Sequence, residues 1–168
     1  MKLYCVHVLH KNVDTGDVKI FKSESDLSSF EYFQRSTIQQ FMTHTSKILV
    51  ERSGLEDRNS VKEGEYQIHC YVRNDGLSAT CVTDAEYQQR VAMSFLERVL
   101  DDFTNRIPSV QWAVIEGEQD CPYPGLKELL ERWQHIPEAG PVTRFHILNL
   151  PKWILSTIWN IIASYIYE

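Results

Sequence analysis

The chain has 168 residues, of which 43% are hydrophobic, 24% are charged and 11% are aromatic. This length corresponds to about one domain at roughly 150 residues per domain, and such a chain can fold without disulfides or metals. The 17 Lys and Arg residues against 23 Asp and Glu residues give a formal net charge of −6. That balance excludes non-specific nucleic-acid binding, which needs a basic surface, and the apolar content excludes general disorder.

The first segment is predicted to form a β-hairpin. Residues 2–10 alternate between two mostly apolar faces, residues 14–16 mark a turn, and residues 18–21 resume a strand. In this alternation the odd-numbered residues share one face and the even-numbered residues share the other. His7 and His10 therefore point to opposite faces and cannot share a metal ion.

A helix and a second hairpin are predicted next. An S-x-x-Q capping box at Ser36 begins an amphipathic pattern that ends near residues 52–54. Two alternating runs, residues 66–72 and 77–82, then flank the turn sequence at residues 74–76. An Asp-Gly turn between two alternating runs is a strong hairpin signal.

The remaining elements are predicted to be mostly helical. A second capping box at Thr83 precedes an apolar stripe that stops before Pro108, and residues 126–133 have the spacing of a short helix. The loop between these helices holds a short strand near Trp112. The resulting order, β-β-α-β-β-α with a short β and α after it, predicts the α+β class, an antiparallel sheet flanked by helices.

The four cysteines are predicted to be reduced and buried. Cys5, Cys70, Cys81 and Cys121 are far apart in the sequence and form no C-x-x-C pair. The N-terminus also lacks the long apolar core of a secretory signal. A cytoplasmic chain without a disulfide framework is the interpretation that follows.

Motifs of catalysis and cofactor binding are missing from the sequence. It contains no Gly-rich phosphate loop, no dinucleotide fingerprint, no nucleophile elbow and no H-E-x-x-H, and its histidines lack ligand spacing. We therefore expect no catalytic residues, no cofactor and no metal, and a binding module rather than an enzyme. Thiol-based acyl transfer through Cys70 or Cys81 is the enzymatic alternative.

Short motifs in residues 1–144 carry a resemblance to a known family. They include MKLY at 1–4, DLSSF at 26–30, FQRS at 33–36, QFMT at 40–43, VERS at 50–53, SVKE at 60–63, YVRND at 71–75 and LDDF at 100–103. In this collinear order they resemble the longin domain of the lipidated, transmembrane-free R-SNAREs of the synaptobrevin class. The resemblance implies a longin (profilin-like) fold, a five-stranded antiparallel sheet with one helix on one face and two on the other, with the segment near Trp112 as the fifth strand.

The resemblance also implies a function and a site. The family fuses transport vesicles with Golgi, endosomal or vacuolar membranes, and its longin domain folds back on the SNARE helix and the lipid through a groove between the first helix and the third strand. We assign the candidate groove for a partner or for the chain's own tail to Phe41, His44, Ile48, Ile68, Cys70 and Val72. His44 stands where the family usually has an aromatic residue. The alternative is that the five other residues are ordinary helix-on-sheet core.

The C-terminal segment departs from the family. We expect a longin domain at residues 1–138 and a divergent tail at 139–168, because the resemblance stops after Arg144 and no SNARE heptads, central arginine or terminal cysteine pair follow. The tail pattern is an apolar helix that could dock in the groove, contact a membrane, or be a by-product of splicing. Its candidate contact residues are Trp153, Ile154, Ile158, Trp159 and Ile162.

These observations predict a SNARE-type protein of vesicle-mediated transport between the endoplasmic reticulum, the Golgi and endosomes. Its longin domain would be a regulatory and protein-interaction module, and the chain a truncated or alternatively spliced form without the SNARE helix. The expected partners are SNARE or trafficking proteins, the chain's own tail and, through that tail, a membrane. The expected location is cytoplasmic and peripheral on Golgi, endosomal or vesicle membranes. A longin-like adaptor or tether subunit is the alternative binding function.

Overall fold

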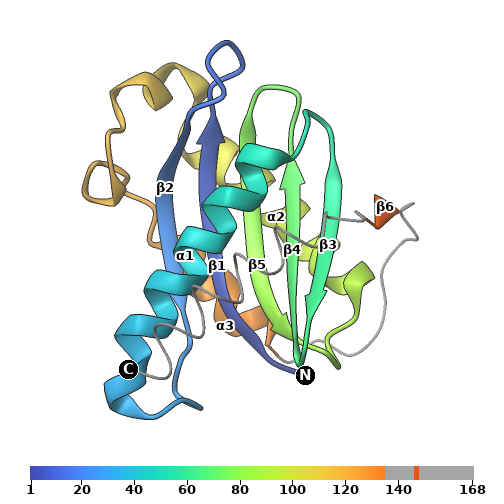
Figure 1. Cartoon of the computed structure of the whole chain (residues 1–168). Coiled ribbons are helices and arrows are strands. Elements are labelled where there is room, and N and C mark those ends of the chain that lie inside the picture. The colour runs from blue at the N-terminus through green and yellow to red at the C-terminus, as the bar shows by residue number, and fades with distance from the viewer. Residues whose placement is uncertain (135–145, 148–168) are drawn as a thin grey trace.

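Five antiparallel strands form the centre of the fold in the computed structural model, which describes residues 1–134 and 146–147 (Figure 1). The strands are β1 (Leu3–Lys11), β2 (Val18–Ser25), β3 (Arg58–Glu63), β4 (Tyr66–Val72) and β5 (Leu77–Asp84). Their order across the sheet is β2-β1-β5-β4-β3. A two-residue strand, β6 (His146–Ile147), pairs in parallel with β3 at that edge.

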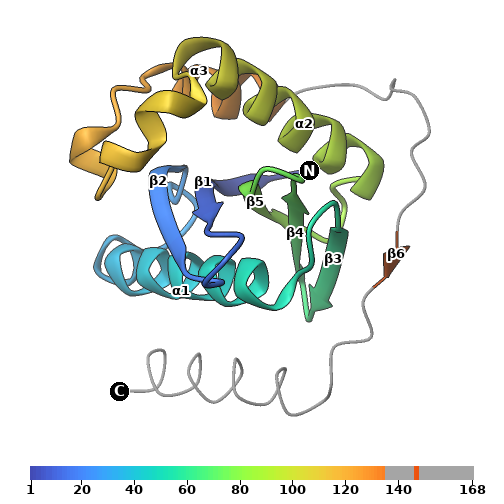
Figure 2. The same cartoon turned by 90° about the horizontal axis from the view of Figure 1, so that it is seen from above.

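Helices cover both faces of the sheet. Figure 2 shows α1 (Arg35–Arg52) on one face, and α2 (Gln89–Arg106) and α3 (Gly125–Trp133) on the other. Three 3-10 segments complete the described elements: η1 (Tyr32–Gln34), η2 (Ser109–Val114) and η3 (Glu118–Asp120). The layering confirms the predicted α+β class and the longin arrangement of one helix against two.

Each face of the sheet has its own apolar core, because both sets of alternating strand residues are covered. On the α2 side, Phe95, Val99 and Phe103 are fully buried, as the helical spacing predicts. On the α1 side, Met42 and Leu49 pack on the sheet. Burying each of these large side chains contributes about 1.5–3 kcal/mol to folding.

The fifth strand is not the one that the sequence predicts. The segment around Trp112 is the 3-10 segment η2, and the fifth strand is β3, which pairs with β4 through a turn at Gly64. Gly64 has φ +57°, which favours glycine. The sequence R-N-S-V-K-E of β3 is polar because an edge strand tolerates solvent and charge. Its one apolar residue, Val61, is too weak a signal for an alternating strand.

Both predicted capping boxes are wrong. Helix α1 begins at Arg35, so Ser36 lies inside its first turn, and the N-cap residue Gln34 makes no side-chain cap hydrogen bond. Helix α2 begins at Gln89, six residues after Thr83. Thr83 lies instead near the end of strand β5. The Thr83 hydroxyl lies 3.1 Å from His69 Nε2, so a tertiary contact replaces the predicted local one.

A β-bulge changes the alternation at the start of β1. The register between β1 and β5 shifts between Leu3 and Cys5. Leu3 consequently joins Val6 in the α2-side core, whereas Tyr4 and Cys5 both lie in the α1-side core. The prediction that Leu3 shares a face with Cys5 is wrong because a bulge inserts a residue and resets the alternation.

The C-terminus of α1 is held by a lysine from another element. Lys11 Nζ, at the end of β1, donates to the backbone oxygens of Val50, Glu51 and Ser53 at 3.3, 3.1 and 2.6 Å. These carbonyls lie at the helix end, where the regular intrahelical bonds stop, and a cation there also complements the helix dipole. The backbone N–H of Lys11 in turn donates to the carbonyl of Gly76, at 2.8 Å.

The end of α3 is fixed to the first strand. The side-chain amide of Gln134 accepts from Leu3 N at 3.0 Å and donates to Leu3 O, so it imitates a strand partner. Tyr87 Oη donates to the carbonyl of Trp133 at 2.8 Å, and the Trp133 ring lies 5.6 Å from Phe95. These contacts fix the end of α3 to β1 and to α2.

Candidate interaction site

Helix α1 carries the candidate site, and its position over the sheet decides what each predicted residue can contact. Ile68, Cys70 and Val72 all lie on β4 and face α1 in the α1-side core, where they are buried. They form the floor beneath the helix. Their role in binding a partner or the tail stays a prediction.

The predicted helix residues occupy a different position. Phe41 is half-buried and packs against the α1-side core, and Ile48 is also half-buried, whereas His44 is exposed. Phe41 and Ile48 lie about 20° apart around the helix at 100° per residue. The structure thus places these two on one flank of α1, with the floor residues below them.

The third strand adds residues that the sequence analysis missed. Strand β3 is the third strand in chain order, and its residues Asn59 and Val61 are buried. Val61 belongs to the α1-side core, against which Phe41 packs. Asn59 Nδ2 donates to Ser53 Oγ at 2.8 Å, which connects β3 to the end of α1. The motif SVKE at 60–63, which contributed to the family resemblance, was the available signal for this strand.

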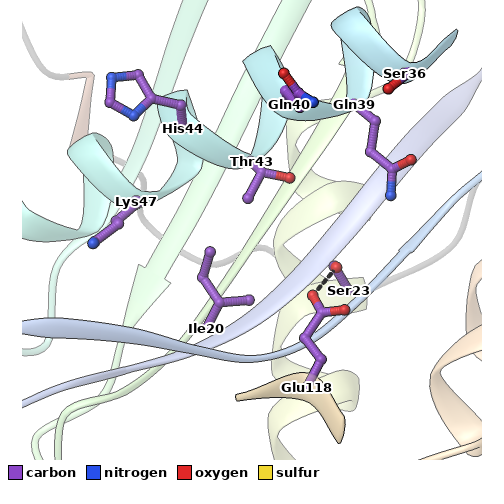
Figure 3. A pocket seen from close by; sticks show the side chains of 9 residues that line it. All are labelled: Ile20, Ser23, Ser36, Gln39, Gln40, Thr43, His44, Lys47 and Glu118. Carbon is purple, nitrogen blue, oxygen red and sulfur yellow. Dashed lines mark hydrogen bonds between the residues drawn. The ribbon is translucent and has the colours of Figure 1, made fainter. Parts of the chain in front are cut away.

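The opposite flank of α1 lines a polar hollow against β2 and η3 (Figure 3). Its volume of about 440 Å³ lies within the range of small-ligand pockets. The lining residues are Ile20, Ser23, Ser36, Gln39, Gln40, Thr43, His44, Lys47 and Glu118. The hollow is therefore a second surface of α1, and one of its lining residues, His44, lies about 40° from Ile48 around the helix at 100° per residue.

Two buried histidines lie on the two faces of the sheet. His7 Nε2 is 3.0 Å from Thr43 Oγ1 and its Nδ1 is 3.4 Å from Ser46 Oγ, beneath α1. His69 Nδ1 is 2.7 Å from Ser60 Oγ on the α2 side of the sheet. Burial lowers the pKa of His7 and that of His69 to about 4, because no described carboxylate offsets the cost of burying the charge. His7 and His10 do point to opposite faces, since His10 stacks on Phe21 at 5.6 Å in the other core.

Acid is expected to destabilise the fold through these two histidines. The unfolded chain titrates near pH 6.5, so between pH 6.5 and about 4 it binds more protons than the folded chain. The stabilising contribution is complete above pH 6.5 and declines as the pH falls toward 4, by about 3 kcal/mol for each histidine. Urea denaturation at a series of pH values should show this decline.

Matched variants identify the source of the acid effect. His7→Gln and His69→Gln should each flatten the pH dependence below pH 6.5, whereas His44→Gln, at an exposed position on α1, should leave it unchanged. An unchanged slope in both buried variants would show that other groups cause the acid response.

The buried thiols are poorly suited to nucleophilic chemistry. Burial raises the pKa of Cys70 to about 12 and holds the pKa of Cys81 well above its ordinary range. The thiolate is the nucleophile, so both groups are almost entirely protonated at neutral pH. All four cysteines are free and buried, as predicted. This geometry gives no support to thiol-based acyl transfer.

The searches for membrane spans and metal clusters apply to the described residues. Over residues 1–134 and 146–147, no helix has both the length and the apolar content to cross a bilayer. The same residues contain no group of three or more His, Cys, Asp or Glu side chains placed to hold a metal ion. The predicted tail contacts, Trp153, Ile154, Ile158, Trp159 and Ile162, lie outside the described residues.

The sequence is similar to one protein family and to several proteins of that kind from fungi and a plant. The Longin family, described as a regulated-SNARE-like domain, matches residues 27–124. The "Synaptobrevin homolog ykt6" of Schizosaccharomyces pombe is 36% identical over 144 residues, which cover 86% of this chain and 71% of that protein. The "Synaptobrevin homolog YKT6" of Yarrowia lipolytica is 34% identical, covering 86% and 72%. The "VAMP-like protein YKT61" of Arabidopsis thaliana is also 34% identical, covering 86% and 71%.

Proposed function

Because the chain belongs to the longin family of synaptobrevin-like SNARE proteins, we propose that its longin domain is a regulatory module that holds an extended segment against α1 and the edge of β3. The chain is a SNARE-type protein of vesicle transport that interacts with SNARE or trafficking proteins. The proposal concerns how this domain acts within that function. Residues 1–138 constitute the longin domain in it, and residues 139–168 supply the segment that is held.

The observation that carries the proposal is the pairing of β6 with β3. His146 lies opposite Asn59 and Ile147 lies opposite Ser60, in parallel register. An extended segment from beyond the domain thus adds to the open edge of the sheet, where unpaired backbone groups favour a further strand. This pairing supports the third-strand side of α1 as the surface that receives the following chain.

The side chains beside this edge suit an apolar occupant. Phe41 and Ile48 are half-buried on the flank of α1, and Val61 closes the core between α1 and β3. In the proposal Phe41 and Ile48 contact the held segment directly. Ile68, Cys70 and Val72 form the floor, and His44 is exposed on α1, three residues after Phe41 and four before Ile48.

The proposed role is binding and not catalysis, since the thiols are buried and the relatives are named as synaptobrevin homologues. A held apolar segment also gives a physical reason for regulation. While it packs on the domain, its apolar side chains are withheld from membranes and partners. Release would expose them and favour peripheral association with vesicle, Golgi or endosomal membranes.

Hydrogen–deuterium exchange of the full chain tests this proposal. The variant His146→Pro/Ile147→Pro removes the backbone N–H groups of β6 and disrupts its pairing with β3. Exchange should therefore accelerate at Ser60, whose N–H points away from β4. Deleting residues 145–168 should produce the same change and lower the melting temperature. Val110→Ala, at a position 84% exposed on η2, is the control that should change neither quantity. Unaltered β3 exchange in both altered chains would contradict the proposal.

A further inference from the structure

The outer edge of β2 has backbone groups available for another strand. Asp26 N donates to Tyr4 O at 2.7 Å, and Cys5 lies opposite Ser25 in the antiparallel register. Bonded and non-bonded pairs alternate in an antiparallel ladder, so the N–H and C=O of Ser25, and likewise of Ser23, point away from β1. Strand β2 is the terminal strand on this side of the sheet.

An acidic segment lies against this edge. We call residues 115–121 the acidic strap, because they include Glu116, Glu118 and Asp120. Two of these carboxylates contact side chains of β2. Glu116 pairs with Lys19 at 3.0 Å, and Glu118 Oε1 accepts a hydrogen bond from Ser23 Oγ, which Figure 3 shows. Among the described residues no backbone hydrogen bond joins the acidic strap to β2.

The acidic strap is attached weakly enough to be displaced. The side chains of Lys19 and Glu116 are 47% and 70% exposed, and ion pairs at that exposure contribute about 0–1 kcal/mol. The strap therefore shields the edge of β2 by side-chain contacts, and within residues 1–134 and 146–147 it makes no backbone pairing with that edge.

Lysines outnumber the one acidic residue of β2, Glu24, along the same edge. Lys19 and Lys22 lie on β2, and Lys47 lines the polar hollow between β2 and α1. The hollow adds the amides of Gln39 and Gln40, which can hydrogen-bond to a peptide main chain. Because the segment already seated here is acidic, a ligand that replaces it should be acidic as well.

We propose that β2 accepts an acidic, extended peptide from a partner protein by strand addition, in competition with the acidic strap. The peptide backbone pairs with the outward groups of Ser23 and Ser25, and its carboxylates pair with Lys19 and Lys22, which lie on the α2 side of β2. The polar hollow receives the side chains that alternate toward α1. This site lies on the opposite edge of the sheet from β3 and is independent of the function proposed above.

A synthetic peptide tests the proposal directly. The probe is a fluorescein-labelled eight-residue peptide of alternating glutamate and threonine, and the matched probe carries lysine in place of glutamate. Fluorescence anisotropy with the full chain at low salt should show binding of the glutamate peptide alone. Amide exchange at Ser23 and Ser25 should slow on binding, while exchange in β3 should not change.

Charge variants separate the strap from the edge. Glu116→Gln/Glu118→Gln should tighten binding about 2- to 20-fold, because it removes two weak competing contacts. Lys19→Gln/Lys22→Gln should weaken it by a similar factor. The control Glu128→Gln/Glu131→Gln makes the same change in net charge on the exposed side of α3 and should not alter binding.

Several results would overturn the proposal. These are equal binding of the two peptides, no detectable binding of the glutamate peptide to the strap variant, and slowed exchange in β3 instead of β2. The last result would assign the peptide to the other edge of the sheet, and so would distinguish this site from the β3 site.

Discussion

Replacing Gly76 with alanine is expected to lower the free energy of unfolding by about 2–5 kcal/mol. Gly76 has φ +85°, a left-handed conformation that is costly for a residue with a Cβ. A Cβ atom there would also stand 2.1 Å from the carbonyl oxygen of Lys11. That oxygen is the main-chain carbonyl of Lys11, the β1 residue whose side chain caps α1, so a shift there would disturb both elements.

Gly16→Ala is the matched control for this effect. Gly16 has φ +78°, close to that of Gly76, but a Cβ at that position meets nothing within 4 Å. Its cost should be about 1–2 kcal/mol from the backbone conformation alone. Urea denaturation of Gly76→Ala and Gly16→Ala separates the cost of the backbone conformation from the cost of the steric clash. Equal losses in the free energy of unfolding would show that the close approach to Lys11 has no energetic consequence.

Phe103→Ala is expected to cost about 3–5 kcal/mol, the usual range for emptying a buried phenylalanine site. Phe103 is fully buried, with its ring centroid 5.9 Å from that of Phe21 and 5.2 Å from that of Tyr123. It therefore connects β2, α2 and the segment that precedes α3. The cavity would open between three elements that cannot all move in to fill it.

Phe33→Ala removes the same side chain from the surface. Phe33 is 77% exposed on η1, and its loss should change the free energy of unfolding by less than about 0.5 kcal/mol. Urea denaturation followed by circular dichroism measures both variants. A cost for Phe103→Ala as small as that for Phe33→Ala would show that the aromatic cluster is not a principal source of stability.

Repeated apolar patterns predicted a helix or strand correctly where the burial of the apolar residues and their local preference favour the same element. The spacing of Phe95, Val99 and Phe103 identified α2, and the alternating runs around Gly76 identified the β4–β5 hairpin. The edge strand β3 escaped prediction because half of its residues face solvent or a polar neighbour. The capping boxes failed for a related reason, since Thr83 makes a tertiary contact with His69 that no local pattern encodes.

The arrangement of the candidate residues in the fold was predicted in part. The sequence placed Phe41 and Ile48 on one stripe of α1 and identified the strand beneath them, and the structure places both sets of residues on that side of the helix. The sequence did not identify Val61 as a site residue, because Val61 lies on β3, the strand that was not predicted. The polar hollow also escaped prediction, since it combines residues from β2, α1 and η3 that are about 100 positions apart at most.

The pairing of Gln134 with Leu3 has a consequence for folding during synthesis. Strand β1 lies between β2 and β5, so its second backbone edge is paired only after the ribosome has released residues 77–84. The end that carries Leu3 is completed later still, when Gln134 arrives. Contacts of such large sequence separation are slow to form. We therefore expect the nascent β1–β2 hairpin to remain unfinished through most of translation, with an exposed edge that chaperones would have to protect.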